Sequence, residues 1–279
     1  MSTPSATFAV WVSAWLNGSA AADDVLDSLG HWAELHDVVA VDGQTAQSLE
    51  VPLRGQAGGQ VAALLAALRR AGVTGGRLVL PVAGDVRGLG GRSEFAGSAL
   101  HAGEAVVLHG APLGLVPEPI ADGVLRWTVF DIGDAPAVEH VPLGESEHEL
   151  TGAMRVAAGV LTELGVAKHR AGVREEITAR VAHQSAAPWP EGTPPRALRV
   201  LQRANEVSAI LHLASEDAPG GALSSSSARR RADALRPLFD AVRIARLAAV
   251  DEAVRIFSDR PDKEHSDTDH VDKDHADKR

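Results

Sequence analysis

The stretch from Gly76 to Pro119 constrains this chain most. Residues 77–82 and 104–109 are short, apolar and rich in β-branched side chains, which is typical of strands. Between them lie several closely spaced glycines, and glycine supplies the backbone conformations that tight turns require. The stretch therefore predicts two strands joined across a glycine-dense turn, with no clear helix between them.

The rest of the first 143 residues alternates helical patterns with short strand patterns. Apolar spacing predicts helices over residues 8–16, 19–35 and 59–72. Further strands are predicted over residues 37–42, 48–53, 124–132 and 138–143. Three of the five tryptophans lie in the first two helices, and we expect them to face the core rather than a partner. Strands joined by short turns indicate a mainly antiparallel sheet. We therefore predict an α+β domain over residues 1–143.

From Gly144 onward the pattern is helical. Ser146 and Glu149 have the spacing of a capping box, and further helices are predicted over residues 170–184 and beyond a proline-rich segment at 185–195. Two apolar stripes then repeat every seven residues, at Val200, Ala204, Val207 and Leu211 and at Leu238, Val242, Ala245 and Ala249. Matching stripes on consecutive helices predict an antiparallel αα-hairpin, with a kink or break at Pro237. We expect a helical domain over residues 144–258, followed by a disordered acidic tail at 259–279.

Composition excludes several classes of protein. The chain has no cysteine, so it forms no disulfide and has no thiolate metal ligand. The first 53 residues contain no lysine or arginine, and their apolar segment is shorter than the roughly 20 residues that span a bilayer. We therefore expect a cytoplasmic protein that does not enter the membrane. The net charge of -10 argues against general nucleic-acid binding.

The glycine-dense turn is one candidate binding site. Backbone N–H groups of glycines and arginine side chains can together hold an anion. The candidate ligand-binding residues are Gly84, Arg87, Gly88, Gly90, Gly91, Arg92 and His101. Ser93 stands where a dinucleotide-binding motif needs its third glycine, and the Gly-Lys-Ser/Thr ending of a phosphate-binding loop is missing. The cofactor is therefore unknown, and a turn without a ligand remains an alternative.

Metal and catalytic sites are not predicted. Glu145 and His148 have the spacing of a carboxylate-bridged metal site, but such a site needs a second Glu-x-x-His pair, which the chain lacks. His101 and His109 flank one predicted strand, and their even spacing would place them on the same face, where they could act as a pair of bases. No nucleophile motif accompanies them. The sequence leaves open whether the protein is an enzyme.

A group of arginines in the last helix is the other candidate site. It comprises Arg229, Arg230, Arg231, Arg236, Arg243 and Arg246. Basic residues at a helix start oppose the helix dipole and therefore call for a negative partner. That partner could be the acidic first 53 residues, another protein or nucleic acid.

Three functional hypotheses follow, in this order. The first is a non-catalytic interaction or regulatory protein that acts through its helical part and binds a protein, either itself or another. The second is an enzyme or a small-molecule or anion-binding protein with its site at residues 84–97. The third is a nucleic-acid-associated factor that uses the arginine group.

Overall fold

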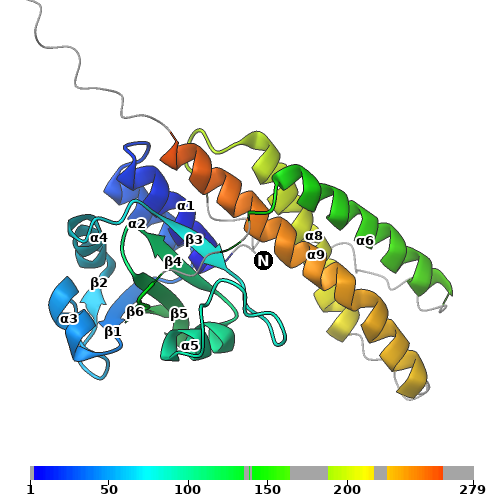
Figure 1. Ribbon diagram of the computed structural model, residues 1–279, viewed down its shortest axis with the longest axis horizontal. Coiled ribbons are helices and arrows are strands. Elements are labelled where there is room, and N and C mark those ends of the chain that lie inside the picture. Colours follow the sequence, from blue (N-terminus) through cyan, green and yellow to red (C-terminus); the bar gives the residue numbers. More distant parts are fainter. Residues whose placement is uncertain (1–2, 135–137, 139, 164–187, 217–224, 260–279) are drawn as a thin grey trace, which may run out of the picture.

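The fold is α+β, as predicted, with a mixed sheet beside a group of long helices (Figure 1). The computed structural model describes residues 3–134, 138, 140–163, 188–216 and 225–259. The strands are β1 (Leu35–Ala40), β2 (Gly59–Gln60), β3 (Gly75–Val79), β4 (Ala105–His109), β5 (Leu113–Ala121) and β6 (Val124–Asp131).

The six strands lie in the order β2-β1-β6-β5-β4-β3. Strands β1 and β6 pair in parallel, and the other neighbours pair antiparallel. The prediction of a mainly antiparallel sheet is therefore confirmed. Strand β3 is an edge strand, so one of its sides is not paired with another strand of this sheet.

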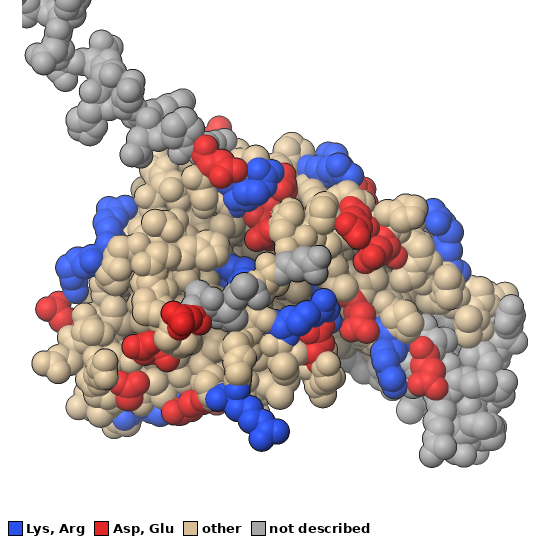
Figure 2. Space-filling model, viewed as in Figure 1, with Lys and Arg blue, Asp and Glu red and all other residues tan. Residues whose placement is uncertain are grey.

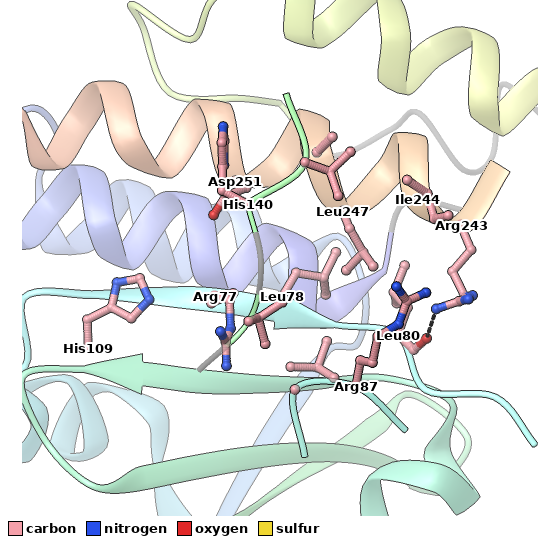
Figure 3. A pocket seen from close by; sticks show the side chains of 15 residues that line it. Arg77, Leu78, Leu80, Arg87, His109, His140, Arg243, Ile244, Leu247 and Asp251 are labelled. Carbon is pink, nitrogen blue, oxygen red and sulfur yellow. Dashed lines mark hydrogen bonds and ion pairs between the residues drawn. The ribbon is translucent and has the colours of Figure 1, made fainter. Parts of the chain in front are cut away.

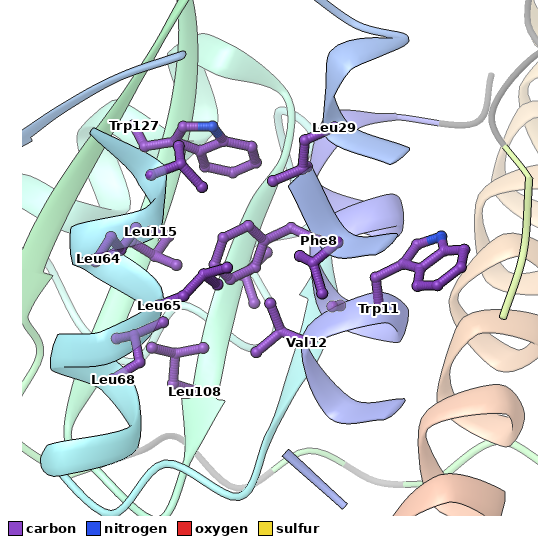
Figure 4. Close-up of a cluster of buried hydrophobic side chains, with 14 of the residues drawn as sticks. Phe8, Trp11, Val12, Leu29, Leu64, Leu65, Leu68, Leu108, Leu115 and Trp127 are labelled. Carbon is purple, nitrogen blue, oxygen red and sulfur yellow. The ribbon is translucent and has the colours of Figure 1, made fainter. Parts of the chain in front are cut away.

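Helices cover both faces of the sheet. The larger core joins one face to α1 (Pro4–Leu16), α2 (Ala22–Gly30) and α4 (Val61–Arg70), with Phe8 and Trp127 in ring contact at 4.9 Å (Figure 4). A smaller core joins the other face to α5 (Glu94–Ala102) through Phe95 and Phe130. The short helix α3 (Gly43–Leu49) follows β1.

The long helices are α6 (Leu143–Glu163), α8 (Pro195–Glu216) and α9 (Ser225–Ser258). Helices α6 and α8 both pack on α9 around a separate apolar core. Asn205 contacts Arg246 and His212 contacts Phe239, so α8 and α9 run antiparallel, as the predicted hairpin requires. The members of both predicted stripes listed above are buried in this core.

Helix α9 belongs to both halves of the molecule. Its residues from Leu235 to Ala249 contribute to the helical core, whereas Val250, Val254 and Phe257 are buried in the core of the sheet. Helix α1 is therefore enclosed between the sheet and α9, and the indole of Trp11 points toward α9 (Figure 4). Its Nε1 donates to the carbonyl oxygen of Pro188 at 2.9 Å. The tryptophans of α1 face the interior, as expected.

Several predicted elements are wrong. Residues 48–53 do not form a hairpin strand, because Asp42 caps α3 by accepting from the amide of Thr45 at 2.9 Å. The described residues among 138–142 are not in a strand. Ser146 lies inside α6 and donates to the carbonyl oxygen of Leu143, so it is not an N-cap. Helix α9 continues through Pro237, so of the predicted kink or break at this residue the break is not found.

Two elements were missed between residues 76 and 119. The glycine-dense turn leads into α5, whose first turn is capped by the hydroxyl of Ser93. Strand β5 was not predicted because it contains Pro117 and Pro119. Those prolines are tolerated because β4 pairs with β5 only at Gly114 and Leu115, which leaves that side of the strand open further along.

The helix predicted over residues 170–184 and nearly all of the predicted disordered tail lie outside the described residues.

Candidate functional site

A cavity of about 330 Å³ lies between the edge strand β3 and helix α9 (Figure 3). Its size is within the range of small-molecule sites. It is lined by Arg77, Leu78, Val79, Leu80, Arg87, Gly88, His109, Val138, His140, Val141, Arg243, Ile244, Leu247, Ala248 and Asp251. The cavity therefore combines an apolar lining with several charged or titratable side chains.

Helix α9 forms one wall with polar groups at its two ends. Arg243, Leu247 and Asp251 follow one another at intervals of four residues, so they share a face of the helix. Because an α-helix rises 1.5 Å per residue, Arg243 and Asp251 are about 12 Å apart along the axis. The apolar side chain of Leu247 lies between them.

The backbone of β3 forms the opposite wall. The amide of Gly76 donates to the hydroxyl of Ser13 at 3.1 Å, so it points away from β4. The carbonyl oxygen of Leu80 accepts from Nη1 of Arg243 at 3.4 Å, so it also points away from β4. In an antiparallel strand, residues alternate between facing the partner strand and facing away from it. The N–H and C=O groups of Leu78, midway between these two residues, are therefore directed to the open edge.

One end of the cavity holds Arg77, His109, His140 and Asp251 (Figure 3). Arg77 and His109 come from adjacent strands, and the register Gly75↔His109 places their side chains on the same face of the sheet. Nδ1 of His140 and Oδ2 of Asp251 are 2.7 Å apart. Residues from β3, β4, α9 and the segment before α6 therefore meet at this end.

Burial weakens the basicity of two of these groups. It lowers the pKa of the Arg77 guanidinium, an effect that the negative charge of Asp251 opposes. Burial also lowers the pKa of His109, and the neighbouring charge of Arg77 lowers it further. Arg77 and His109 therefore hold positive charge less readily than exposed side chains of the same kind.

The other end of the cavity is tied to the glycine-dense turn through Asp85. Arg87 donates to its two carboxylate oxygens at 2.9 and 2.6 Å, and Nη2 of Arg243 donates to Oδ2 at 2.5 Å. Hydrogen bonds from Arg87, followed by those from Arg243, hold the pKa of Asp85 well below its usual range. The ion pair between Asp85 and Arg243 fixes the turn to α9.

Gly88 closes the cavity between the sheet and the segment before α6. Its φ is +86°, and a Cβ atom built there would lie 3.4 Å from side-chain atoms of both Val79 and Val138. A side chain at this position would be strained and tightly packed.

The structure brings together only part of the predicted ligand site. Arg87 and Gly88 line the cavity, but Gly84, Gly90, Gly91, Arg92 and His101 do not. Arg92 is exposed, and His101 is exposed on α5, whereas His109 ends β4 and lines the cavity, so the structure does not bring the two histidines into one site. The sequence interpretation missed Arg77, His109, His140 and Asp251 as members of this site. A charged residue inside the apolar segment 77–82 was the available signal for Arg77.

The predicted arginine group does not form one surface. Arg243 pairs with Asp85, and its side chain is only 12% exposed. Arg246 donates to Asn205 at 3.0 Å, and burial lowers its pKa to about 10. Arg236 is exposed and pairs with Asp233. Arg229, Arg230 and Arg231 lie in the first turns of α9, but their side chains are outside the described part of the chain. Figure 2 shows acidic and basic side chains interspersed on the face it presents.

Among the described residues, no three histidine or acidic side chains are grouped so that they could hold a metal ion. Glu145 and His148 lie near the start of α6. Within the described part of the chain, every helix is too short or too polar to cross a membrane.

Comparisons with known proteins point to one family. Residues 5–140 match the N-terminal domain of the Rv1486c-like proteins, and residues 144–247 match their C-terminal domain. The chain is 38% identical over 281 residues to "Uncharacterized protein Rv1486c" of Mycobacterium tuberculosis (strain ATCC 25618 / H37Rv), covering 88% of this chain and 96% of that protein.

Two further relatives come from other mycobacteria. "Uncharacterized protein ML1804" of Mycobacterium leprae (strain TN) is 32% identical over 293 residues, with 89% of this chain and 96% of the relative covered. "Uncharacterized protein MAV321" of Mycobacterium avium is 33% identical over 296 residues, with 88% of this chain and 96% of the relative covered. No solved structure matches the chain. Both halves of the sequence and nearly the full length of these relatives agree, so the chain belongs to the Rv1486c-like protein family.

Proposed function

We propose that this protein is a non-catalytic binding protein whose ligand carries an acidic group and occupies the cavity between β3 and α9. The observation that carries the proposal is the position of Arg77, a partly buried guanidinium that lines the cavity beside His109. Arginine is well suited to carboxylates and phosphates because its planar guanidinium donates several hydrogen bonds in a fixed geometry.

The chemistry of the lining favours binding over covalent catalysis. No serine, threonine or lysine is found among the described residues that line the cavity, and the chain has no cysteine. His140 and Asp251 are the side chains that an acid–base reaction would use, since Asp251 is placed to orient the imidazole. An enzyme acting at this site is the alternative, and detection of turnover of a bound compound would favour it.

Thermal denaturation tests the proposal directly. Phosphate, sulfate and succinate are added separately at low ionic strength, and binding at 100 times Kd adds about 2.7 kcal/mol to the free energy of unfolding. We expect at least one of these anions to stabilise the protein, and Arg77→Gln to remove that effect. Arg92→Gln is the matched control because Arg92 belongs to the predicted turn but lies outside the cavity.

The proposal fails if none of these anions stabilises the wild-type protein. It also fails if Arg92→Gln removes the stabilisation and Arg77→Gln retains it, because the anion would then bind at the exposed turn. Circular dichroism of both variants establishes that each is folded before the comparison is made.

A second candidate function is association with a protein through the helical part. Its specific support is exposed apolar surface: Val156 on α6 is 66% exposed and Ile210 on α8 is 47% exposed. Light scattering during size-exclusion chromatography, at low and high salt, tests self-association. If Val156→Asp and Ile210→Asp leave the measured mass unchanged and the wild type is a monomer, self-association through these residues is excluded.

The third hypothesis, nucleic-acid association through the arginine group, has less support than the other two. Arg243 and Arg246 are engaged inside the molecule and are poorly placed to contact phosphates. The cytoplasmic location expected from the sequence also stays a prediction.

A further inference from the structure

The wall that α9 contributes to the cavity is apolar between its two polar ends. Between Arg243 and Asp251, the residues of this helix that line the cavity are all aliphatic. They are Ile244, Leu247 and Ala248, whose spacing of i, i+3 and i+4 places them on one face of the helix. Ile244 and Leu247 are only partly buried, so part of this aliphatic face of α9 is open to the cavity (Figure 3).

Ile244 is the member of the aliphatic face that is most available to a ligand. Leu247 packs against the core of the sheet, and Ala248 is buried in the helical core. Ile244 packs in none of the three apolar cores that the described residues form. A ligand that covers this side chain removes apolar surface from water, and that removal favours binding.

The segment before α6 adds apolar surface to the same cavity. Val138 is 42% exposed and Val141 is partly buried, and both line the cavity. The described lining residues include no phenylalanine or tryptophan, and the chain has no tyrosine. A flat aromatic ligand would therefore lack the large rings on which such molecules stack, whereas an aliphatic ligand meets side chains of its own kind.

Polar side chains are found at the ends of the wall that α9 forms. Nδ1 of His140 and Oδ2 of Asp251 are 2.7 Å apart at one end, and Nη2 of Arg243 donates to Oδ2 of Asp85 at the other. A sugar or a nucleoside lying along this wall would bring hydroxyl groups against the aliphatic face, whose side chains neither donate nor accept hydrogen bonds. Burying a polar group without a partner disfavours binding. The wall therefore favours a ligand whose middle part is hydrocarbon.

The size of the cavity limits the ligand to a small molecule. Its volume is about 330 Å³, near the lower end of the range of small-molecule sites. The aliphatic face lies within the stretch of about 12 Å along the helix axis between Arg243 and Asp251. A single short chain suits these dimensions.

We propose that the ligand of this cavity is a small aliphatic acid whose hydrocarbon chain lies on the aliphatic face of α9 and contacts Ile244. This inference rests on the proposed function, from which the acidic group is taken, and the apolar lining alone places the chain. Each methylene group that leaves water tightens binding about fourfold, which corresponds to roughly 0.8 kcal/mol.

The test titrates the full-length protein with acids of increasing chain length. Butanoate, hexanoate, octanoate and decanoate are each kept below the concentration at which they form micelles, and isothermal titration calorimetry measures Kd at constant pH and ionic strength. Butanol, hexanol and octanol are measured in parallel. Ile244→Asn tests the aliphatic face, and Val156→Asn is the matched control, because Val156 is 66% exposed on α6 and does not line the cavity.

We expect Kd to fall about fourfold for each added methylene group until the chain fills the cavity, and to level off beyond that length. Ile244→Asn should reduce the gain per methylene group, and Val156→Asn should preserve it. A Kd that does not change with chain length would overturn the inference. A gain that persists undiminished in Ile244→Asn would also overturn it, because the chain would then bind elsewhere.

The alcohols and the short acid separate this inference from the proposed function. Binding of butanoate with no gain for the longer acids would overturn the aliphatic chain and leave recognition of an acidic group intact. Alcohols that bind as tightly as the acids would overturn recognition of an acidic group and leave the aliphatic chain in place. If no acid or alcohol binds, the inference is rejected, and the titrations with phosphate, sulfate and succinate decide the proposed function separately. The chain-length series uses the wild-type protein, so its outcome does not depend on the folding of a variant.

Discussion

Replacement of Arg243 by alanine should destabilise this protein far more than replacement of Arg87. Both arginines bind the same carboxylate, that of Asp85. Their surroundings differ: the side chain of Arg87 is 70% exposed, whereas that of Arg243 is 12% exposed. The comparison therefore separates the effect of burial from the effect of ion pairing itself.

The magnitudes follow from these contacts. Arg243→Ala removes hydrogen bonds to Asp85 and to the carbonyl oxygen of Leu80, in a partly buried setting where hydrogen bonds of charged groups contribute about 1.5–3 kcal/mol. Asp85 keeps Arg87 as a partner, so the loss stays below the roughly 3–5 kcal/mol that accompanies a fully orphaned buried charge. We expect a loss of about 2–3 kcal/mol for Arg243→Ala. For Arg87→Ala, an exposed ion pair, we expect less than about 1 kcal/mol.

Urea denaturation of the two variants and the wild type, followed by circular dichroism, measures both changes in the free energy of unfolding. The double variant adds a check, because Asp85 then loses both partners. Its loss of unfolding free energy should exceed the sum of the losses in the two single variants. Equal losses in the two single variants, or a larger loss for Arg87→Ala, would refute the reasoning that Arg243 ties the glycine-dense turn to α9.

Three further predictions concern the cores and pH. Leu211→Glu should unfold the helical bundle, because Leu211 is 2% exposed and lies in the core of that bundle. Circular dichroism measures the loss of helical content. A variant that stays folded and no longer self-associates would contradict this prediction. Phe257→Ala should cost about 3–5 kcal/mol in urea denaturation, because its fully buried ring belongs to the sheet core; a loss below about 1 kcal/mol would show that the end of α9 is not docked there. The pKa of His109 is lowered in the folded state, so folding disfavours protonation of this side chain. The free energy of unfolding therefore decreases as the pH falls below 6.5, the pKa of His109 in the unfolded chain. His109→Gln should therefore flatten the decline in the urea midpoint between pH 7.5 and 5.5, and an unchanged decline would oppose this assignment.

Local sequence patterns predicted the elements whose contacts are local or strongly periodic. The spacing of Val207 and Leu211 identified a buried helical stripe, and the apolar residues of α1 identified a core helix. The two strands around the glycine-dense turn were also expected, as was the mainly antiparallel sheet. In these cases the periodicity that creates the apolar face is visible within one segment.

The errors have specific physical causes. Residues 48–53 were predicted as a strand, but the cap supplied by Asp42 starts helix α3, which continues to Leu49. Strand β5 carries prolines that argue against a strand, and it tolerates them because its partner β4 begins at Ala105 and does not extend alongside them. The outcome for β5 depends on which strands become neighbours, which the local pattern does not contain.

The candidate site was only partly predictable for the same reason. Arg87 and Gly88 could be proposed because they belong to a conspicuous turn. Arg77, His109 and Asp251 are distant in sequence: pairing of β3 with β4 brings Arg77 and His109 together, and α9 adds Asp251 by returning along the edge of β3. The division into domains at residues 143 and 144 is also still a prediction. Because Phe257 and its neighbours lie in the sheet core, we expect an isolated 144–258 fragment to be less stable than the same residues in the full chain.

The most direct measurement is an NMR titration of the ¹⁵N-labelled protein with phosphate at low ionic strength. Binding in the cavity predicts that the largest amide shift changes fall on Arg77, Leu78 and Gly88 and on the face of α9 between Arg243 and Asp251. Shift changes concentrated instead at Arg92 and α5, or on the outer surfaces of α6 and α8, would contradict the assignment of the site.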